Sequence, residues 1–153
     1  MKFLKFVVVT GVFILSLGVC AMSQAHVPAQ GSVERKTIID GIKALYKATG
    51  DSEGKPYRGT ITFDVKYIKA NGAWAWVYAE PRSTSTRDQF GENSGYLLHA
   101  ETDGKWKVQE LPPPVEDPDD PENLDYPSAK DVVQIRKMHR SAPANIFPVN
   151  KNN

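Results

Sequence analysis

Cysteine is almost absent from this chain of 153 residues: Cys20 is the only one, and it lies in an N-terminal segment that we expect to be removed. A chain without a cysteine pair forms no disulfide, although disulfides are permitted outside the cytoplasm. Structural zinc sites built on thiolates are excluded for the same reason. The three histidines, His26, His99 and His139, are far apart and show no metal-ligand spacing. We therefore expect no metal and no cofactor, and a fold stabilised by apolar burial.

A surplus of charge is missing too, because the whole chain carries a net charge of only +1. Without Lys2 and Lys5, which belong to the segment to be removed, 17 basic side chains stand against 18 acidic ones, a net charge of −1. Nucleic-acid-binding domains carry a strong positive surplus, and polybasic patches hold proteins on anionic lipid. The composition therefore predicts no nucleic-acid partner and no basic patch for membranes.

The N-terminal segment, 1–25, has the three parts of a secretory signal peptide: lysines first, then an apolar run, then small residues. The run is too short for a transmembrane helix, which needs about 20 apolar residues. We predict cleavage after Ala25, with cleavage after Ala21 as the alternative. The protein is then secreted, periplasmic in a Gram-negative cell, without stable membrane insertion. Lipidation of Cys20 stays open, although the preceding Val19 is larger than the small residue of a lipoprotein signal.

A helix is predicted over 33–48, after a flexible leader at 26–32. Ser32 is a natural N-cap, and Gly50 suits the left-handed residue that ends a helix. Five apolar residues of this segment recur at helical spacing. They are Ile38, Ile39, Ile42, Leu45 and Tyr46. The helix therefore presents one apolar stripe and must pack on another element.

A first hairpin is predicted next. The segment TITFDVKYIK, 60–69, alternates apolar and polar residues, which is typical of a half-buried strand. Asn71-Gly72 follows, a strong signal for a two-residue turn. That turn pairs Tyr67 with Trp76, so the aromatic stripe of the second strand shares a face with the apolar side of the first. We predict that this common face packs against the N-terminal helix.

The aromatic stripe consists of Trp74, Trp76 and Tyr78 at alternate positions. Burying one large apolar side chain contributes about 1.5–3 kcal/mol, and a small domain without disulfides needs that stabilisation. We therefore interpret the stripe as core. A carbohydrate or peptide platform is the alternative, with Trp74, the residue nearest the turn, as its binding residue.

A second hairpin is predicted from SGYLLHAETDGKWKVQEL. A three-residue turn that ends at a left-handed Gly104 gives the better separation of apolar and polar faces. This turn pairs Ala100 with Trp106. The same register pairs Leu98 with Val108, so that all four side chains fall on one face.

The chain thus divides into an α+β core at 33–111, a linker at 112–127, and a C-terminal helix and tail at 128–153. The linker is rich in proline and acidic residues, a composition typical of extended, solvated chain. Ser128 is the natural N-cap of the C-terminal helix.

One resemblance covers most of this region. The pattern ERKTIIDGIKALY, ITFDVKYIKANGAWAWVYAEP, GYLLHAETDGKWKVQEL and SAPANIFP resembles a group of small secreted bacterial proteins without assigned function. Their order of one helix and then a meander is similar to the cystatin-like and nuclear-transport-factor-2-like α+β folds. The resemblance implies that fold type and carries over no functional residue, because such folds host unrelated functions.

We predict an α+β fold: an N-terminal helix packed on a four-stranded antiparallel meander, plus a short C-terminal helix. No nucleophile elbow, phosphate loop or paired-acid motif is present in the sequence. The leading hypothesis is therefore a non-catalytic module that binds a protein or peptide of the cell envelope, with an inhibitor of an envelope enzyme as a sub-case. It would bind through a sheet edge or the loop at 81–94. The candidate binding residues are Trp74, Arg82, Arg87 and Phe90; no catalytic or metal-binding residue is predicted.

Two alternatives accompany this hypothesis. The first is a small hydrolase or isomerase with a pocket between helix and sheet. The lining of that pocket would be Tyr67, Trp76, Tyr78 and Trp106. The second is a homodimer that buries the other face of the sheet, where the small apolar residues are Ala75, Val77 and Ala79.

Overall fold

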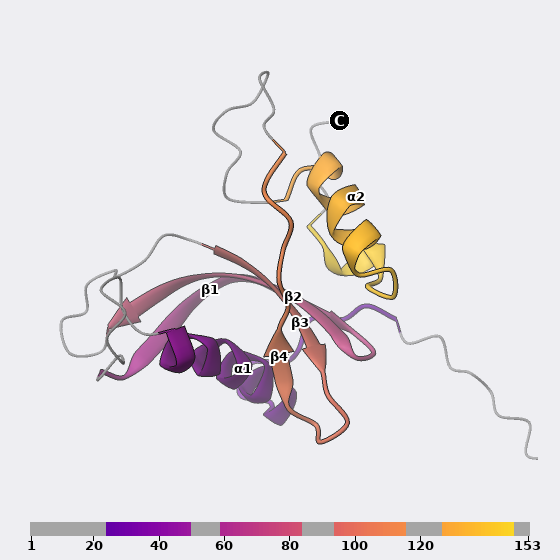
Figure 1. The fold of residues 1–153 in the computed structure, drawn as a ribbon. Helices are drawn as coiled ribbons and strands as arrows, with labels where there is room; N and C mark the ends of the chain where they lie inside the picture. Colours follow the sequence, from indigo (N-terminus) through magenta and orange to yellow (C-terminus); the bar gives the residue numbers. More distant parts are fainter. Residues whose placement is uncertain (1–23, 50–58, 84–93, 116–126, 149–153) are drawn as a thin grey trace, which may run out of the picture.

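The predicted α+β architecture is confirmed by the computed structural model, which describes residues 24–49, 59–83, 94–115 and 127–148. The elements are α1 (Val33–Thr49), β1 (Ile61–Asn71), β2 (Trp74–Ser83), β3 (Ser94–Ala100), β4 (Trp106–Val108), α2 (Ala129–Met138) and a 3-10 helix, η2 (Ala144–Ile146). The four strands form one antiparallel sheet in the order β1-β2-β3-β4. Figure 1 shows α1 and α2 on opposite sides of this sheet.

The N-terminal helix begins at Val33, directly after its predicted N-cap, Ser32. The Ser32 side chain accepts a hydrogen bond from the backbone N–H of Arg35 at 3.1 Å, which satisfies one of the free donors of the first turn. Ile38 and Ile42 are fully buried. Gly41 lies between them in the sequence, and a Cβ there would stand 2.5 Å from the backbone oxygen of Trp106. The missing side chain therefore lets α1 approach β4 closely.

The register of the first hairpin differs from the prediction. Asn71 pairs with Trp74, so the turn residues are Gly72 and Ala73 instead of Asn71 and Gly72. Tyr67 consequently lies opposite Tyr78, not opposite Trp76. Gly72 still adopts positive φ, at 59°, but Asn71 keeps its place in the ladder. The prediction placed Gly72 in the turn correctly but paired the strands wrongly. A glycine at positive φ fits a turn at Asn71-Gly72 and also one at Gly72-Ala73.

A β-bulge in β1 divides its apolar face into two. The register shifts between Val65 and Tyr67, which pair with Ala79 and Tyr78 respectively. The extra residue, Lys66, reverses the alternation of side chains. Val65 therefore faces α1 while Tyr67 faces α2, and the prediction of one continuous face along β1 was wrong.

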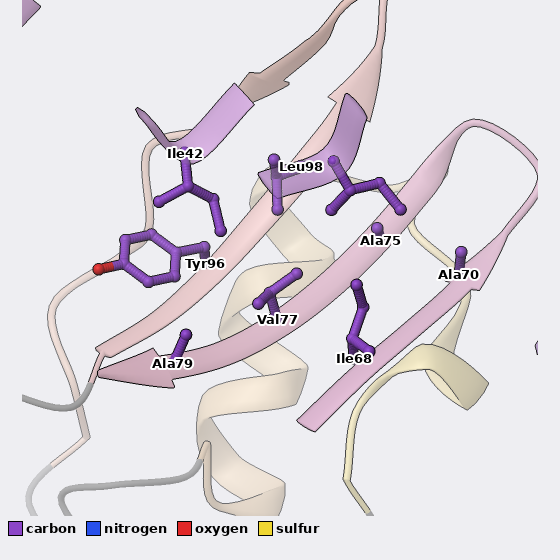
Figure 2. Packing of buried hydrophobic residues seen from close by; sticks show 9 residues of the cluster. Ile42, Ile68, Ala70, Ala75, Val77, Ala79, Tyr96 and Leu98 are labelled. Carbon is purple, nitrogen blue, oxygen red and sulfur yellow. The ribbon is translucent and has the colours of Figure 1, made fainter. Parts of the chain in front are cut away.

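The α1 side of the sheet is built from small residues of β2. Ala75, Val77 and Ala79 are fully buried there together with Ile42 of α1, as Figure 2 shows. The remaining buried members of this cluster are Ile38, Ile68, Ala70, Tyr96 and Leu98. The face that we considered for a homodimer therefore lies inside the core of the single chain.

The aromatic stripe is core, as predicted, but its cover is the C-terminal region and not α1. Trp74, Trp76 and Leu97 pack with residues from α2, η2 and the segment around them. Those residues are Ile135, Ala142, Ile146 and Phe147. The Phe147 ring lies 5.1 Å from the Trp76 ring. Small side chains on β2 suit a close helix, and the larger aromatic face is left for the C-terminal segment.

The second hairpin has the predicted register. Leu98 pairs with Val108 and Ala100 with Trp106. Gly104 adopts a left-handed conformation with φ of 79°, and its N–H donates to the Glu101 carbonyl at 2.9 Å. Here the facing of the side chains and the turn chemistry agree on a single register.

The segment expected to be a flexible leader contacts the sheet. The backbone N–H and C=O of His26 both bond Ala70 of β1, each at 2.8 Å. Pro28 is buried, and the His26 ring bonds Glu34 at 2.9 Å. The segment therefore joins β1 to the start of α1.

The C-terminal helix is capped as expected. Ser128 and Asp131 form a reciprocal capping box, and Asp131 also accepts the backbone N–H of Val115 at 2.7 Å. Most of the predicted proline-rich, acidic linker, 116–126, lies outside the described residues, as does most of the predicted signal peptide.

Candidate functional site

The four candidate binding residues do not form one site in the described part of the chain. Trp74 and Arg82 lie at opposite ends of β2, and eight strand residues span about 26 Å. Arg87 and Phe90 lie outside the described residues. Each end of β2 must therefore be considered separately.

At the turn end, Trp74 is enclosed by two histidines. Its ring lies 4.5 Å from His99 of β3 and 5.8 Å from His139 at the end of α2. His139 Nε2 lies 2.7 Å from the backbone oxygen of Glu110 and donates to it. Only 8% of Trp74 is exposed. A flat carbohydrate platform needs an open ring face, so this arrangement does not favour the platform alternative.

At the other end of β2, four charged side chains gather. Arg82 pairs with Glu80 at 3.0 Å and with Asp64 at 3.5 Å, and Asp64 also pairs with Lys66. The hydrogen bond from Lys66 holds the pKa of Asp64 below its usual value. The Glu80 side chain is 11% exposed, and the Arg82 guanidinium compensates its burial. Within the described residues two cations and two anions balance here, so this charged end offers mixed polar contacts without a surplus of charge.

Sequence reasoning had named Arg82 but missed its partners. The sequence-predicted register places Asp64 opposite Ala79, whereas Asp64 pairs with Glu80 in the structure. The observed register brings Asp64 and Glu80 together, where Arg82 pairs with both. This register depends on the turn placement and on the bulge at Lys66, and missing both hid the cluster.

The pocket proposed for a hydrolase or isomerase is not assembled. Tyr67 and Trp76 pack on the α2 side of the sheet, and Tyr78 shares their face by alternation along β2. Trp106 packs on the α1 side. Among the described residues no three His, Cys, Asp or Glu side chains are grouped as metal ligands.

The outer edge of β1 has few backbone partners among the described residues. His26 bonds Ala70, and continuing that antiparallel pairing places Pro28 opposite Ile68. Proline has no N–H to donate and so ends an added strand. From Ile61 to Lys69, no further backbone bridge covers this edge in the described ranges. At the opposite edge of the sheet, β4 lies directly against Gly41 of α1.

Two remaining findings concern the whole chain. Within the described ranges, no helix combines the length and apolar character that a bilayer crossing requires. The resemblance to cystatin-like and nuclear-transport-factor-2-like folds stays a prediction. Comparisons with protein-family models, curated proteins and solved structures find no match to this chain.

Proposed function

We propose that this chain is an exported, non-catalytic binding module that takes an extended segment of a protein or peptide partner against the outer edge of β1. The partner belongs to the cell envelope, periplasmic in a Gram-negative cell. The observation that carries the proposal is the long edge strand, Ile61–Asn71, of which only Ala70 has a backbone partner on the outer side in the described part of the chain.

The partner segment would add to the sheet as an extra strand beside β1, and the unpaired backbone groups of the edge favour this mode of binding. Unpaired N–H and C=O groups along an edge bond any extended chain laid beside them, so the backbone provides affinity. The N-terminal segment already uses this mode once, through the two hydrogen bonds between His26 and Ala70. Pro28 ends the pairing of the N-terminal segment with β1, so the edge from Ile61 to Lys69 stays available to a partner.

Side chains beside the edge would provide selectivity. Lys66 stands at the bulge with 41% of its side chain exposed, next to Asp64 and Arg82. A bulge with an exposed lysine also disfavours indiscriminate edge pairing. We therefore expect the bound segment of the partner to carry both acidic and basic side chains. One partner of this kind is an envelope hydrolase, which the module would inhibit by occupying its peptide-binding cleft.

Site-directed photo-cross-linking tests the proposal. Lys66→Cys places a thiol at the edge, and Lys36→Cys places one on the exposed outer face of α1 as a control with the same loss of charge. Each variant is labelled with a benzophenone maleimide, irradiated in envelope extract of the parent organism, and analysed by mass spectrometry.

We expect one dominant adduct from Lys66→Cys that an excess of unlabelled protein suppresses, and no such adduct from Lys36→Cys. Absence of a competed adduct, or the same adduct from both positions, would contradict binding at the β1 edge.

A further inference from the structure

The outer side of α2 combines basic and apolar residues on one face. At 100° per residue, Lys130, Arg136 and Lys137 lie within about 60° of Val133. Ile135, which is 3% exposed, lies on the opposite side and packs on the sheet. Arg140 follows just after the helix and is exposed. We call these residues, Lys130, Val133, Arg136, Lys137 and Arg140, the cationic face.

Among the described residues, no carboxylate pairs with the C-terminal half of this face. Asp131 is the one acidic residue of α2, and the backbone N–H groups of Ser128 and Val115 bond its carboxylate at 2.8 and 2.7 Å. Within the part of the chain that the structure describes, Arg136, Lys137 and Arg140 form no ion pair. Basic residues in a last turn also favour the helix dipole, so the charge alone would not indicate a ligand.

An exposed apolar side chain provides the second observation. Val133 is 54% exposed and lies in the middle of these cations. Met138 is 52% exposed but lies about 140° from Val133, on the side of Ile135, and does not belong to the cationic face. Cations around an exposed apolar side chain are typical of a helix that lies in a membrane interface.

The other helix, α1, also exposes apolar side chains, Val33 and Leu45, but its charges are mixed. On α1, Lys43 pairs with Asp40 at 3.1 Å, and Glu34 pairs with His26 at 2.9 Å. Its outward charges are therefore of both signs. The net charge of the whole chain is close to zero and therefore does not reveal this difference between the two helices.

We propose that the cationic face of α2 docks on the surface of an anionic lipid bilayer, with Val133 entering the headgroup region. The helix forms the outermost layer on its side of the sheet, away from α1 (Figure 1). A cationic helix on the outside of the molecule fits a planar anionic surface, and the exposed valine needs no preformed pocket there. This docking concerns peripheral binding, and it is independent of strand addition at β1.

Vesicle co-sedimentation of the purified protein tests the docking. The vesicles are phosphatidylcholine alone or phosphatidylcholine mixed with phosphatidylglycerol. Arg136→Gln/Lys137→Gln removes two cations from the last turn of α2. Lys36→Gln/Lys47→Gln removes two exposed cations from α1, one of them in its last turn, and is the matched control for net charge. All variants are prepared in the same secreted form, without the predicted signal peptide 1–25, so that its apolar run does not bind the vesicles.

We expect binding to the anionic vesicles only, and a loss of affinity of about thirtyfold in the α2 variant, because each cation near the surface contributes roughly a fivefold factor. The α1 variant keeps its affinity. Raising the ionic strength to about 1 M, where the Debye length is about 3 Å, releases the protein. Val133→Ser weakens the binding that remains.

Three outcomes would overturn the proposal. One is equal binding to both kinds of vesicle, and another is an equal loss in the α1 and α2 variants. The third is retention by immobilised polyglutamate without binding to anionic vesicles, which would assign the cationic face to an acidic protein instead.

Discussion

Gly95 makes room for a tryptophan ring. A Cβ at this position would stand 2.5 Å from Cζ2 and 2.8 Å from Cη2 of Trp76, whose ring is buried under Phe147. We predict that Gly95→Ala destabilises the fold by about 1–3 kcal/mol through overpacking, although alanine is normally the better strand residue. Urea denaturation measures the change.

A double-mutant cycle tests the cause. Trp76→Phe removes the two ring carbons that meet the new methyl group, so Gly95→Ala should cost less in that background. An unchanged cost of Gly95→Ala would show that the backbone of β3, and not the indole ring, resists the substitution.

His26 and Glu34 give the molecule a small dependence on pH. The hydrogen bond to Glu34 raises the pKa of His26 above 6.5. A raised pKa in the folded state means that the pair stabilises the fold at pH below the unfolded value, and that this contribution is lost as pH rises through the folded value. The pair is half exposed, so the effect on stability is small.

An NMR titration of the His26 ring checks this prediction. Glu34→Gln should bring the pKa back toward its ordinary value. Asp40→Asn removes another carboxylate of α1, which bonds Lys43, and should leave the His26 titration unchanged. A His26 pKa at or below 6.5 in the unmodified protein is incompatible with the hydrogen bond.

At the scale of the elements, the contact between α1 and β4 depends on Gly41. Alanine would raise the helix propensity by about 1 kcal/mol, but its Cβ would meet the backbone oxygen of Trp106 at 2.5 Å. The Trp106 backbone cannot rotate away as a side chain could. We therefore predict that overpacking, which costs about 1–3 kcal/mol of folding free energy, outweighs the gain in helix propensity. Gly41→Ala should lower the thermal unfolding midpoint.

Lys36→Ala is the control on the exposed face of the same helix, and we expect a change within about 0.5 kcal/mol. A Gly41→Ala variant that is more stable than the unmodified protein would show that α1 moves away from β4 at little cost.

Local signals predicted most elements correctly. Ser32 and Ser128 cap their helices as expected, and Gly104 sets the second hairpin. The first hairpin failed because Asn71-Gly72 admits two turn placements, and because no local signal marks Lys66 as the bulge. The charged end, Asp64 with Glu80 and Arg82, was missed for the same reason.

At the scale of the whole molecule, one sheet carries two separate cores. Ile42 belongs to the α1 side and Phe147 to the α2 side. We predict that Ile42→Ala and Phe147→Ala each destabilise the fold by about 2–5 kcal/mol. Of the two substitutions, only Phe147→Ala should expose the Trp76 ring, because the Phe147 ring contacts it.

Acrylamide quenching of a variant with Trp76 as its single tryptophan distinguishes the two cores. We expect weak quenching in that variant, stronger quenching with Phe147→Ala, and no change with Ile42→Ala. Strong quenching of Trp76 before any further substitution would contradict the C-terminal cover.

The sequence by itself determined the two helices and four strands, the N-caps Ser32 and Ser128, and the second register. These features depend on neighbours within a few residues, where backbone and side-chain chemistry allow one solution. The apolar alternation along β2 also predicted the burial of Trp74 and Trp76. Only the tertiary structure decided which cover lies on which face. Both faces of β2 are apolar, and Ala75, Val77 and Ala79 accept a close helix while Trp74 and Trp76 require a looser cover. The open edge at β1 and the cationic face of α2 follow from that choice, because a surface is defined by what remains uncovered once both cores have formed.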